Sequence, residues 1–156
     1  MANIKEEFGT STSITITLNS LATSATAGRA SAAIDFTTDK FIDVLFTVTV
    51  KILTGTIAND KGCHVWLYLS EDGTNYADAL SAGDAAYTPN SPNNAVYLGF
   101  IEMPTQSATY RKIFSLRDRF SSVPRKAVLV VRNYCGINLD STGNSATYTG
   151  IYYTSV

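Results

Sequence analysis

The chain has 156 residues, which is enough for one domain with its own hydrophobic core. Its formal net charge is only -1 and its basic residues form no long run, so nucleic-acid binding is disfavoured. Its apolar runs have the length of strands and its first residues carry two glutamates, so we expect neither a membrane span nor a signal peptide, and synthesis in the cytoplasm.

The first ten residues, "MANIKEEFGT", are too polar to contribute to a core. They carry two isolated apolar side chains, Ile4 and Phe8, which suits an arm that becomes ordered by docking on a neighbouring subunit. We therefore divide the chain into an N-terminal arm at 1–10 and a folded domain at 11–156. The arm predicts a homo-oligomer, and a trimer is the form that we favour.

Alternation of apolar and polar residues at every second position dominates the rest of the chain. This period is typical of a strand with one buried face, whereas a helix would scatter the same residues around its surface. The first example is "STSITITL" at 11–18, and the longest is "DVLFTVTVKIL" at 43–53. Weaker alternation predicts a strand at 29–36. Further strands are predicted at 63–70, 95–102, 108–116, 126–134 and 146–154.

These segments amount to roughly eight strands separated by turn-rich connections, and no stretch has a sustained helical repeat. Segments 20–30 and 114–123 could each hold a helical turn, but both are too short to cover a sheet. The fold class that we predict is all-β, a single-domain antiparallel β-sandwich that is jelly-roll-like. Its core should contain Val44, Phe46, Val48, Val50, Val65, Leu67, Leu129 and Val131.

The strand at 63–70 has apolar side chains on both faces, so both faces need cover. Trp66 and Tyr68 lie on its outer face. Large rings there predict either a subunit interface or a further covering layer. The long polar connection at 71–94 is the surface where we expect a partner, because connections of this length usually serve contacts or remain mobile. Other rings assigned to outer faces are Tyr97, Tyr148, Tyr152 and Tyr153.

The stretch "SEDGTNY" at 70–76 could be a turn or a ligand-binding loop. Gly73 would supply the positive φ of a tight turn, and Asp72 could close that turn through its own carboxylate. A calcium loop needs carboxylates at closer, alternating positions than this chain offers. We favour the turn and keep a glycan contact through Asp72 and Tyr76 as a weaker alternative.

Catalytic patterns are missing from the sequence. His64 is the single histidine, and no nucleophile elbow, phosphate-binding glycine loop or pair of catalytic acids stands out. The two cysteines, Cys63 and Cys135, lie in hydrophobic stretches and are predicted to be reduced buried thiols. We therefore expect no enzyme activity, no cofactor and no metal site.

Basic residues gather between Arg111 and Lys126, although the whole chain is nearly neutral. We favour a solvated loop whose basic residues pair locally with Asp118. The alternative is a basic patch, with Arg117 and Arg119, that meets an acidic patch on a neighbouring subunit.

Three stretches, "TSITITLNSLATSATAGRASAAIDFTTDKFIDVLFTVTVKI", "VWLYLSEDGTNYAD" and "LDSTGNSATYTGIYYTSV", together resemble a family of small structural proteins from tailed double-stranded DNA bacteriophages. The segment "FSLRDRFSSVPRK" departs from that family because it is more charged. The matching positions are mainly turn residues: Gly28, Arg29, Ser31, Asp35, Asp43, Ser70, Asp72, Gly73, Gly143, Tyr148 and Gly150.

The resemblance implies a non-enzymatic virion component, made in the bacterial host cytoplasm and displayed in many copies. It would serve as a capsid decoration or cement protein or as an accessory neck or tail protein, and its partners would be major capsid, neck or tail subunits. The alternative is a receptor-facing carbohydrate-binding module of a tail or head fibre that uses the aromatic face and the 70–76 loop. A hydrolase fragment of a tail spike is the weakest candidate.

Overall fold

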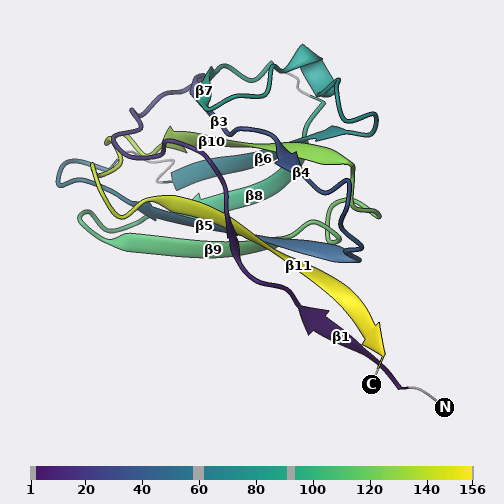
Figure 1. The fold of residues 1–156 in the computed structure, drawn as a ribbon. Helices are drawn as coiled ribbons and strands as arrows, with labels where there is room; N and C mark the ends of the chain where they lie inside the picture. Colours follow the sequence, from purple (N-terminus) through teal and green to yellow (C-terminus); the bar gives the residue numbers. More distant parts are fainter. Residues whose placement is uncertain (1–2, 58–61, 91–93, 156) are drawn as a thin grey trace.

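The computed structural model describes residues 3–57, 62–90 and 94–155, and these residues form two antiparallel β-sheets that pack face to face (Figure 1). They contain eleven strands, one short 3-10 helix and no α-helix. The predicted all-β antiparallel sandwich is therefore confirmed, with more strands than the eight we expected. None of the described helical structure is long or apolar enough to cross a membrane.

One sheet has five strands in the order β1-β11-β5-β9, with β2 pairing β11 beside β1. Its strands are β1 (Ile4–Phe8), β2 (Thr12–Ser13), β5 (Asp43–Lys51), β9 (Thr109–Ser115) and β11 (Ser145–Ser155).

The other sheet has six strands in the order β7-β3-β10-β6-β8, with β4 also pairing β10. The helix η1 (Ala77–Ala79) lies in the connection between β6 and β7. The strands of this sheet are β3 (Gly28–Ala30), β4 (Ile34–Asp35), β6 (Gly62–Ser70), β7 (Ala85–Tyr87), β8 (Val96–Glu102) and β10 (Lys126–Tyr134).

The main core lies between the two sheets, where the alternating residues of β5 meet those of β6 and β10. Both cysteines are buried there as free thiols, as predicted. Tyr148 also packs on this core, edge-on against Phe36, so its assignment to an outer face was wrong. The eight predicted core residues, Val44, Phe46, Val48, Val50, Val65, Leu67, Leu129 and Val131, are all completely buried.

The predicted strand at 11–18 is wrong beyond Ser13. Ile14 and Leu18 are buried, as the alternation requires. The backbone of this segment, however, forms hydrogen bonds with residues of both sheet regions and does not continue as a strand of one sheet. The amide of Ile14 donates to Ala146 in the five-stranded sheet at 2.9 Å, while the Thr15 carbonyl accepts from Ala32 at 2.9 Å, near the six-stranded sheet. Alternating burial shows that every second side chain faces the core, but it does not show that the backbone pairs within one sheet. This segment crosses from one sheet to the other, so its side chains alternate without forming a strand.

The connection between β6 and β8 does not remain an open loop. Its described residues, 71–90 and 94–95, fold back along the outer face of the six-stranded sheet (Figure 1). The helix η1 lies in this connection, and β7 joins the edge of the same sheet beside β3. We call residues 71–90 and 94–95 the covering segment. Leu80 and Tyr87 of this segment pack with Tyr68 in a second hydrophobic cluster. The structure shows that one side of this connection packs on the sheet, and the expectation that the connection meets a partner stays a prediction.

Candidate functional site

The two ends of the chain form a ribbon that projects from the sandwich (Figure 1). Pairing between β11 and β5 ends at Ile151, whereas β1 pairs antiparallel with Ile151–Ser155. We call β1 together with Ile151–Ser155 the terminal ribbon. The sequence assigned residues 1–10 to an arm that is ordered by a neighbouring subunit. The structure instead orders residues 4–8 within the chain, as a strand against its own C-terminal strand.

One face of the terminal ribbon is apolar and uncovered. Ile4 is 73% exposed, Phe8 63% and Tyr153 56%, which are the three largest values among the described large hydrophobic residues. The register places Ile4 opposite Ser155, Glu6 opposite Tyr153 and Phe8 opposite Ile151, so these side chains share one face. This face of the terminal ribbon is therefore a candidate interaction surface.

The terminal ribbon also carries charges that are not paired within the described chain. Lys5 and Glu7 point to the face opposite Phe8, because side chains alternate along a strand. Glu6 lies between Ile4 and Phe8 on the apolar face. None of these three charged residues forms an ion pair with another described residue.

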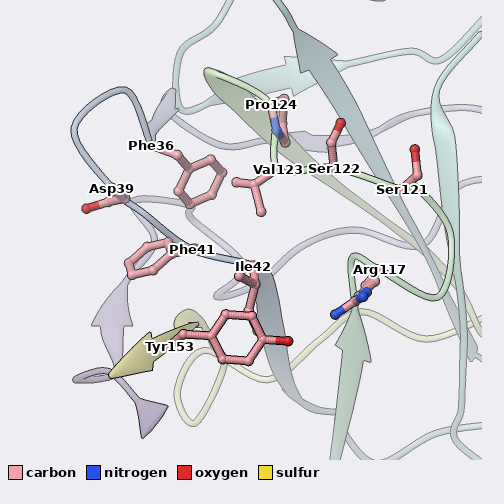
Figure 2. A pocket seen from close by; sticks show the side chains of 10 residues that line it. All are labelled: Phe36, Asp39, Phe41, Ile42, Arg117, Ser121, Ser122, Val123, Pro124 and Tyr153. Atoms are coloured by element: carbon pink, nitrogen blue, oxygen red, sulfur yellow. The ribbon is translucent and has the colours of Figure 1, made fainter. Parts of the chain in front are cut away.

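A hollow of about 440 Å³ lies at the base of the terminal ribbon (Figure 2). Arg117, one of the predicted interface residues, extends its side chain into this hollow toward Tyr153 of the ribbon. The backbone of Arg117 is fixed by Asp43, whose buried carboxylate accepts from the Arg117 amide at 2.9 Å and from the Ser115 hydroxyl at 2.7 Å. The hollow therefore combines an arginine whose backbone is fixed with a mixed lining of apolar and polar side chains.

Gly150 explains how the wall of this hollow is built. The Phe41 ring lies directly on Gly150, and a Cβ at that position would overlap with the ring. Because only glycine lets the ring approach so closely, Gly150 allows Phe41 to line the hollow just before the ribbon leaves the sandwich.

Arg119 does not share the hollow of Arg117. It lines a second hollow of about 420 Å³ between β8 and β9, beside Lys112 and Phe100. Neither arginine forms an ion pair with Asp118 among the described residues, so the predicted local pairing is not observed. The basic residues of this region are therefore divided between two surfaces and do not make one patch.

Trp66 and Tyr68 do not form an exposed interface, and this prediction was wrong. Tyr68 is completely buried under the covering segment, with its ring edge-on to Tyr87 at 5.4 Å between centroids. Burial raises the pKa of the Tyr68 phenol, and its hydroxyl makes no hydrogen bond within the described residues. Trp66 is only 8% exposed, and the Arg132 guanidinium lies 5.0 Å from its ring centroid. Of the two alternatives for the outer rings, a subunit interface or a covering layer, the structure shows a covering layer formed by the same chain.

Beyond the covering segment, the same sheet carries a more open aromatic cluster. Sequence analysis correctly placed Tyr97 on an outer face but did not identify His64 and Phe100 as its neighbours. His64 lies 4.9 Å from Phe100 between ring centroids and shares a hydrogen bond with the Tyr97 hydroxyl at 2.9 Å. Strict alternation would place Tyr97 and Phe100 on opposite faces. A β-bulge at Leu98, between the Val65–Gly99 and Trp66–Tyr97 pairs, brings them to one face, and Gly99 accommodates it with φ of 148°. A glycine within an otherwise regular strand was the available signal.

The 70–76 stretch is a closed turn. One Asp72 carboxylate oxygen accepts from the amides of Thr74 and Asn75, both at 2.8 Å, and Gly73 has φ of 80°. These backbone donors hold the pKa of Asp72 well below its ordinary value. Tyr76 is half-buried against the second hydrophobic cluster. Across the described chain, no three His, Cys, Asp or Glu residues are grouped to hold a metal ion.

Comparison with known proteins identifies no relative, because no protein-family model, curated protein or solved structure matches this chain.

Proposed function

We propose that this protein is a non-enzymatic structural protein of a tailed-bacteriophage virion that assembles in many copies on the particle. It would act there as a capsid decoration or cement protein or as an accessory neck or tail protein. The phage assignment rests on the sequence resemblance. The observation that supports an assembling role is the terminal ribbon, whose apolar face is left uncovered by the rest of the chain.

The division of the molecule suits a repeated building block. The sandwich has its own hydrophobic core between the two sheets. The terminal ribbon offers two highly exposed apolar side chains on β1, Ile4 and Phe8, and burying each stabilises a contact by about 1.5 to 3 kcal/mol. Such a contact is weak alone, because association and side-chain ordering oppose it. It becomes effective when a particle holds many copies close together.

A carbohydrate-binding module is the second candidate, and the open cluster around Tyr97 favours it. Tyr97 is 41% exposed and lies beside the His64 and Phe100 rings. The larger Trp66 ring offers little stacking surface, because Arg132 and His64 already occupy it. The aromatic platform available to a sugar is therefore small.

Quantitative mass spectrometry of purified particles tests the virion role. We expect the protein in the particle at a fixed stoichiometry. A high copy number would correspond to the head, and a number matching a symmetric ring would correspond to the neck or tail. Absence from purified particles would overturn the structural role. A glycan array probed with the purified protein tests the second candidate, with Tyr97→Ala as its control variant.

A further inference from the structure

We propose that the terminal ribbon binds a second copy of this chain edge to edge. In this contact β1 of one copy pairs antiparallel with β1 of the other, about a two-fold axis at Glu6. The inference rests on the assembling role proposed above and names the partner that the ribbon takes.

The outer edge of β1 is free and unprotected. Within the described residues β1 pairs only with β11, so the backbone amides and carbonyls along its other edge have no strand partner. All five residues of β1 are exposed, and its register with β11 contains no bulge. A regular strand edge with exposed apolar side chains is a template for pairing with another chain.

Three other sheet edges, those of β8, β9 and β7, are blunted in ways that β1 is not. On β8 the strand is bulged, and the Phe100 carbonyl already accepts from Lys112 Nζ at 2.8 Å. That same lysine extends from β9, where its position opposite the core residue Val48 puts a charge on the inner side of the edge. The third edge, β7, is only three residues long. Short edges, bulges and inward-pointing lysines all discourage strand addition, so β1 is better suited to pairing than these three edges.

The sequence of β1 is complementary to itself in this arrangement. Antiparallel pairing centred on Glu6 places Ile4 opposite Phe8 of the second copy, and Lys5 opposite Glu7. Each of these pairs occurs twice because of the two-fold axis. The apolar pairs lie on the face that carries Tyr153, and the ion pairs lie on the other face. A shift by one residue would place apolar side chains opposite charged ones, so the two-fold register is the favoured one.

The contact is weak by construction. The two Glu6 carboxylates meet at the axis, and like charges directly opposite each other oppose strand pairing. Five residues from each copy also bury far less area than a stable dimer needs. We therefore expect pairing at high protein concentration in solution and at the local concentration of a particle. A two-fold contact gives a dimer, or an assembly built from dimers, in place of the trimer favoured from the sequence.

Charge exchange tests the register. Self-association of the full chain is measured by sedimentation over a concentration series. Lys5→Glu and Glu7→Lys should each weaken it about tenfold or more, because two attractive pairs become repulsive. The double variant Lys5→Glu/Glu7→Lys should restore it, and the two single variants mixed together should form a heterodimer. An unrelated interface would not show this rescue.

Cysteine cross-linking tests the axis. Glu6→Cys places a thiol opposite its own copy, so mild oxidation should give a disulfide-linked dimer. Lys5→Cys is the matched control, because it faces Glu7 in this register and should cross-link poorly. The native thiols of Cys63 and Cys135 are buried and should not compete.

The proposal is overturned if single charge reversals leave self-association unchanged, if the double variant fails to restore it, or if Glu6→Cys cross-links no better than Lys5→Cys. It is also overturned if the intact chain stays monomeric at the highest soluble concentration and Glu6→Cys gives no covalent dimer. If the protein does not self-pair but is present in purified particles, the virion role is retained and the ribbon is assigned to a contact with another virion protein. If the protein self-pairs but is absent from particles, the self-pairing proposal is retained and the virion role is rejected.

Discussion

Two outer surfaces of this molecule carry large apolar side chains, and only one of them is covered by another segment of the chain. On the six-stranded sheet, Tyr68 is completely buried because the covering segment folds back across it. On the terminal ribbon, Ile4 and Phe8 remain more than half exposed, because the strands run beyond the sandwich (Figure 1). An outward-facing apolar residue on a strand therefore identifies an interface only where no other segment of its own chain covers it.

The largest loss of stability should come from a substitution in the core between the two sheets. Val48 is completely buried on the inner face of β5, and Val48→Asp would place an unpaired carboxylate in the core. That costs several kcal/mol against a total stability of about 5 to 15 kcal/mol, so we expect no cooperative unfolding transition by circular dichroism. Thr47→Asp, one residue along on the outer face, is the control and should still melt cooperatively. Cooperative melting of Val48→Asp at the original temperature would refute the assigned core face.

The comparison itself can be tested with one pair of truncations. Tyr68→Ala removes a ring that is buried by the covering segment, and we expect a loss of about 3 to 5 kcal/mol in the free energy of unfolding. Phe8→Ala removes a ring that is mostly exposed, and the change should stay within about 0.5 kcal/mol. Denaturant unfolding of both variants measures the difference. Equal losses would mean that the two surfaces are covered to the same extent.

The attachment of the covering segment can be weakened through Asp84. Its carboxylate accepts from Arg29 Nε at 2.6 Å and from the Thr17 amide at 2.8 Å. These bonds join the covering segment to β3 and to the chain between β2 and β3. The hydrogen bond from Arg29 is the main cause that lowers the pKa of Asp84 to about 2. A lowered pKa stabilises the fold above the unfolded value near 4, and this contribution disappears as the pH falls from about 4 to about 2.

We therefore expect Asp84→Asn to lose about 1 to 2 kcal/mol of unfolding free energy at pH 7, and much less near pH 2. Denaturant unfolding across this pH range measures the difference. Asp39→Asn, at an exposed carboxylate without an ion pair among the described residues, is the control. A loss that does not change with pH would contradict a role for the ionised carboxylate.

The smallest effect separates the Tyr68 ring from its hydroxyl. The hydroxyl has no hydrogen-bond partner among the described residues. We therefore expect Tyr68→Phe to change the free energy of unfolding by less than about 1 kcal/mol, because the variant loses no hydrogen bond. Thermal unfolding of this variant beside Tyr68→Ala assigns the stabilisation to the buried ring. A loss comparable to that of Tyr68→Ala would assign it to the hydroxyl.

The sequence was sufficient for the parts of the fold that depend on local alternation. Val44, Phe46, Val48 and Val50 all face the core, because period two and β-branched side chains both favour a strand at that position. The turn at Asp72 was predictable for a similar reason, since its donors lie within three residues of it.

The features that sequence reasoning missed depend on contacts between distant segments. Alternation placed Tyr68 on an outer face correctly, but it could not reveal what covers that face. Ile14 and Leu18 alternate as strand residues do, although their backbone serves two sheets. The pairing of Ile4 with Ser155 joins opposite ends of the described chain, and nothing in the local pattern of "IKEEF" indicates its partner strand.

The pairing of β1 with β11 can form only late during synthesis. β1 is the first described strand to leave the ribosome and β11 is the last, so the terminal ribbon has the longest loop to close of any strand pair in the structure. Such long-range pairs form late, after the more local pairs of the sandwich are available. A nascent or truncated chain lacking β11 would have a β1 segment without its sheet partner. The ribbon edge that we propose as the contact between copies would then form only after β11 has been made.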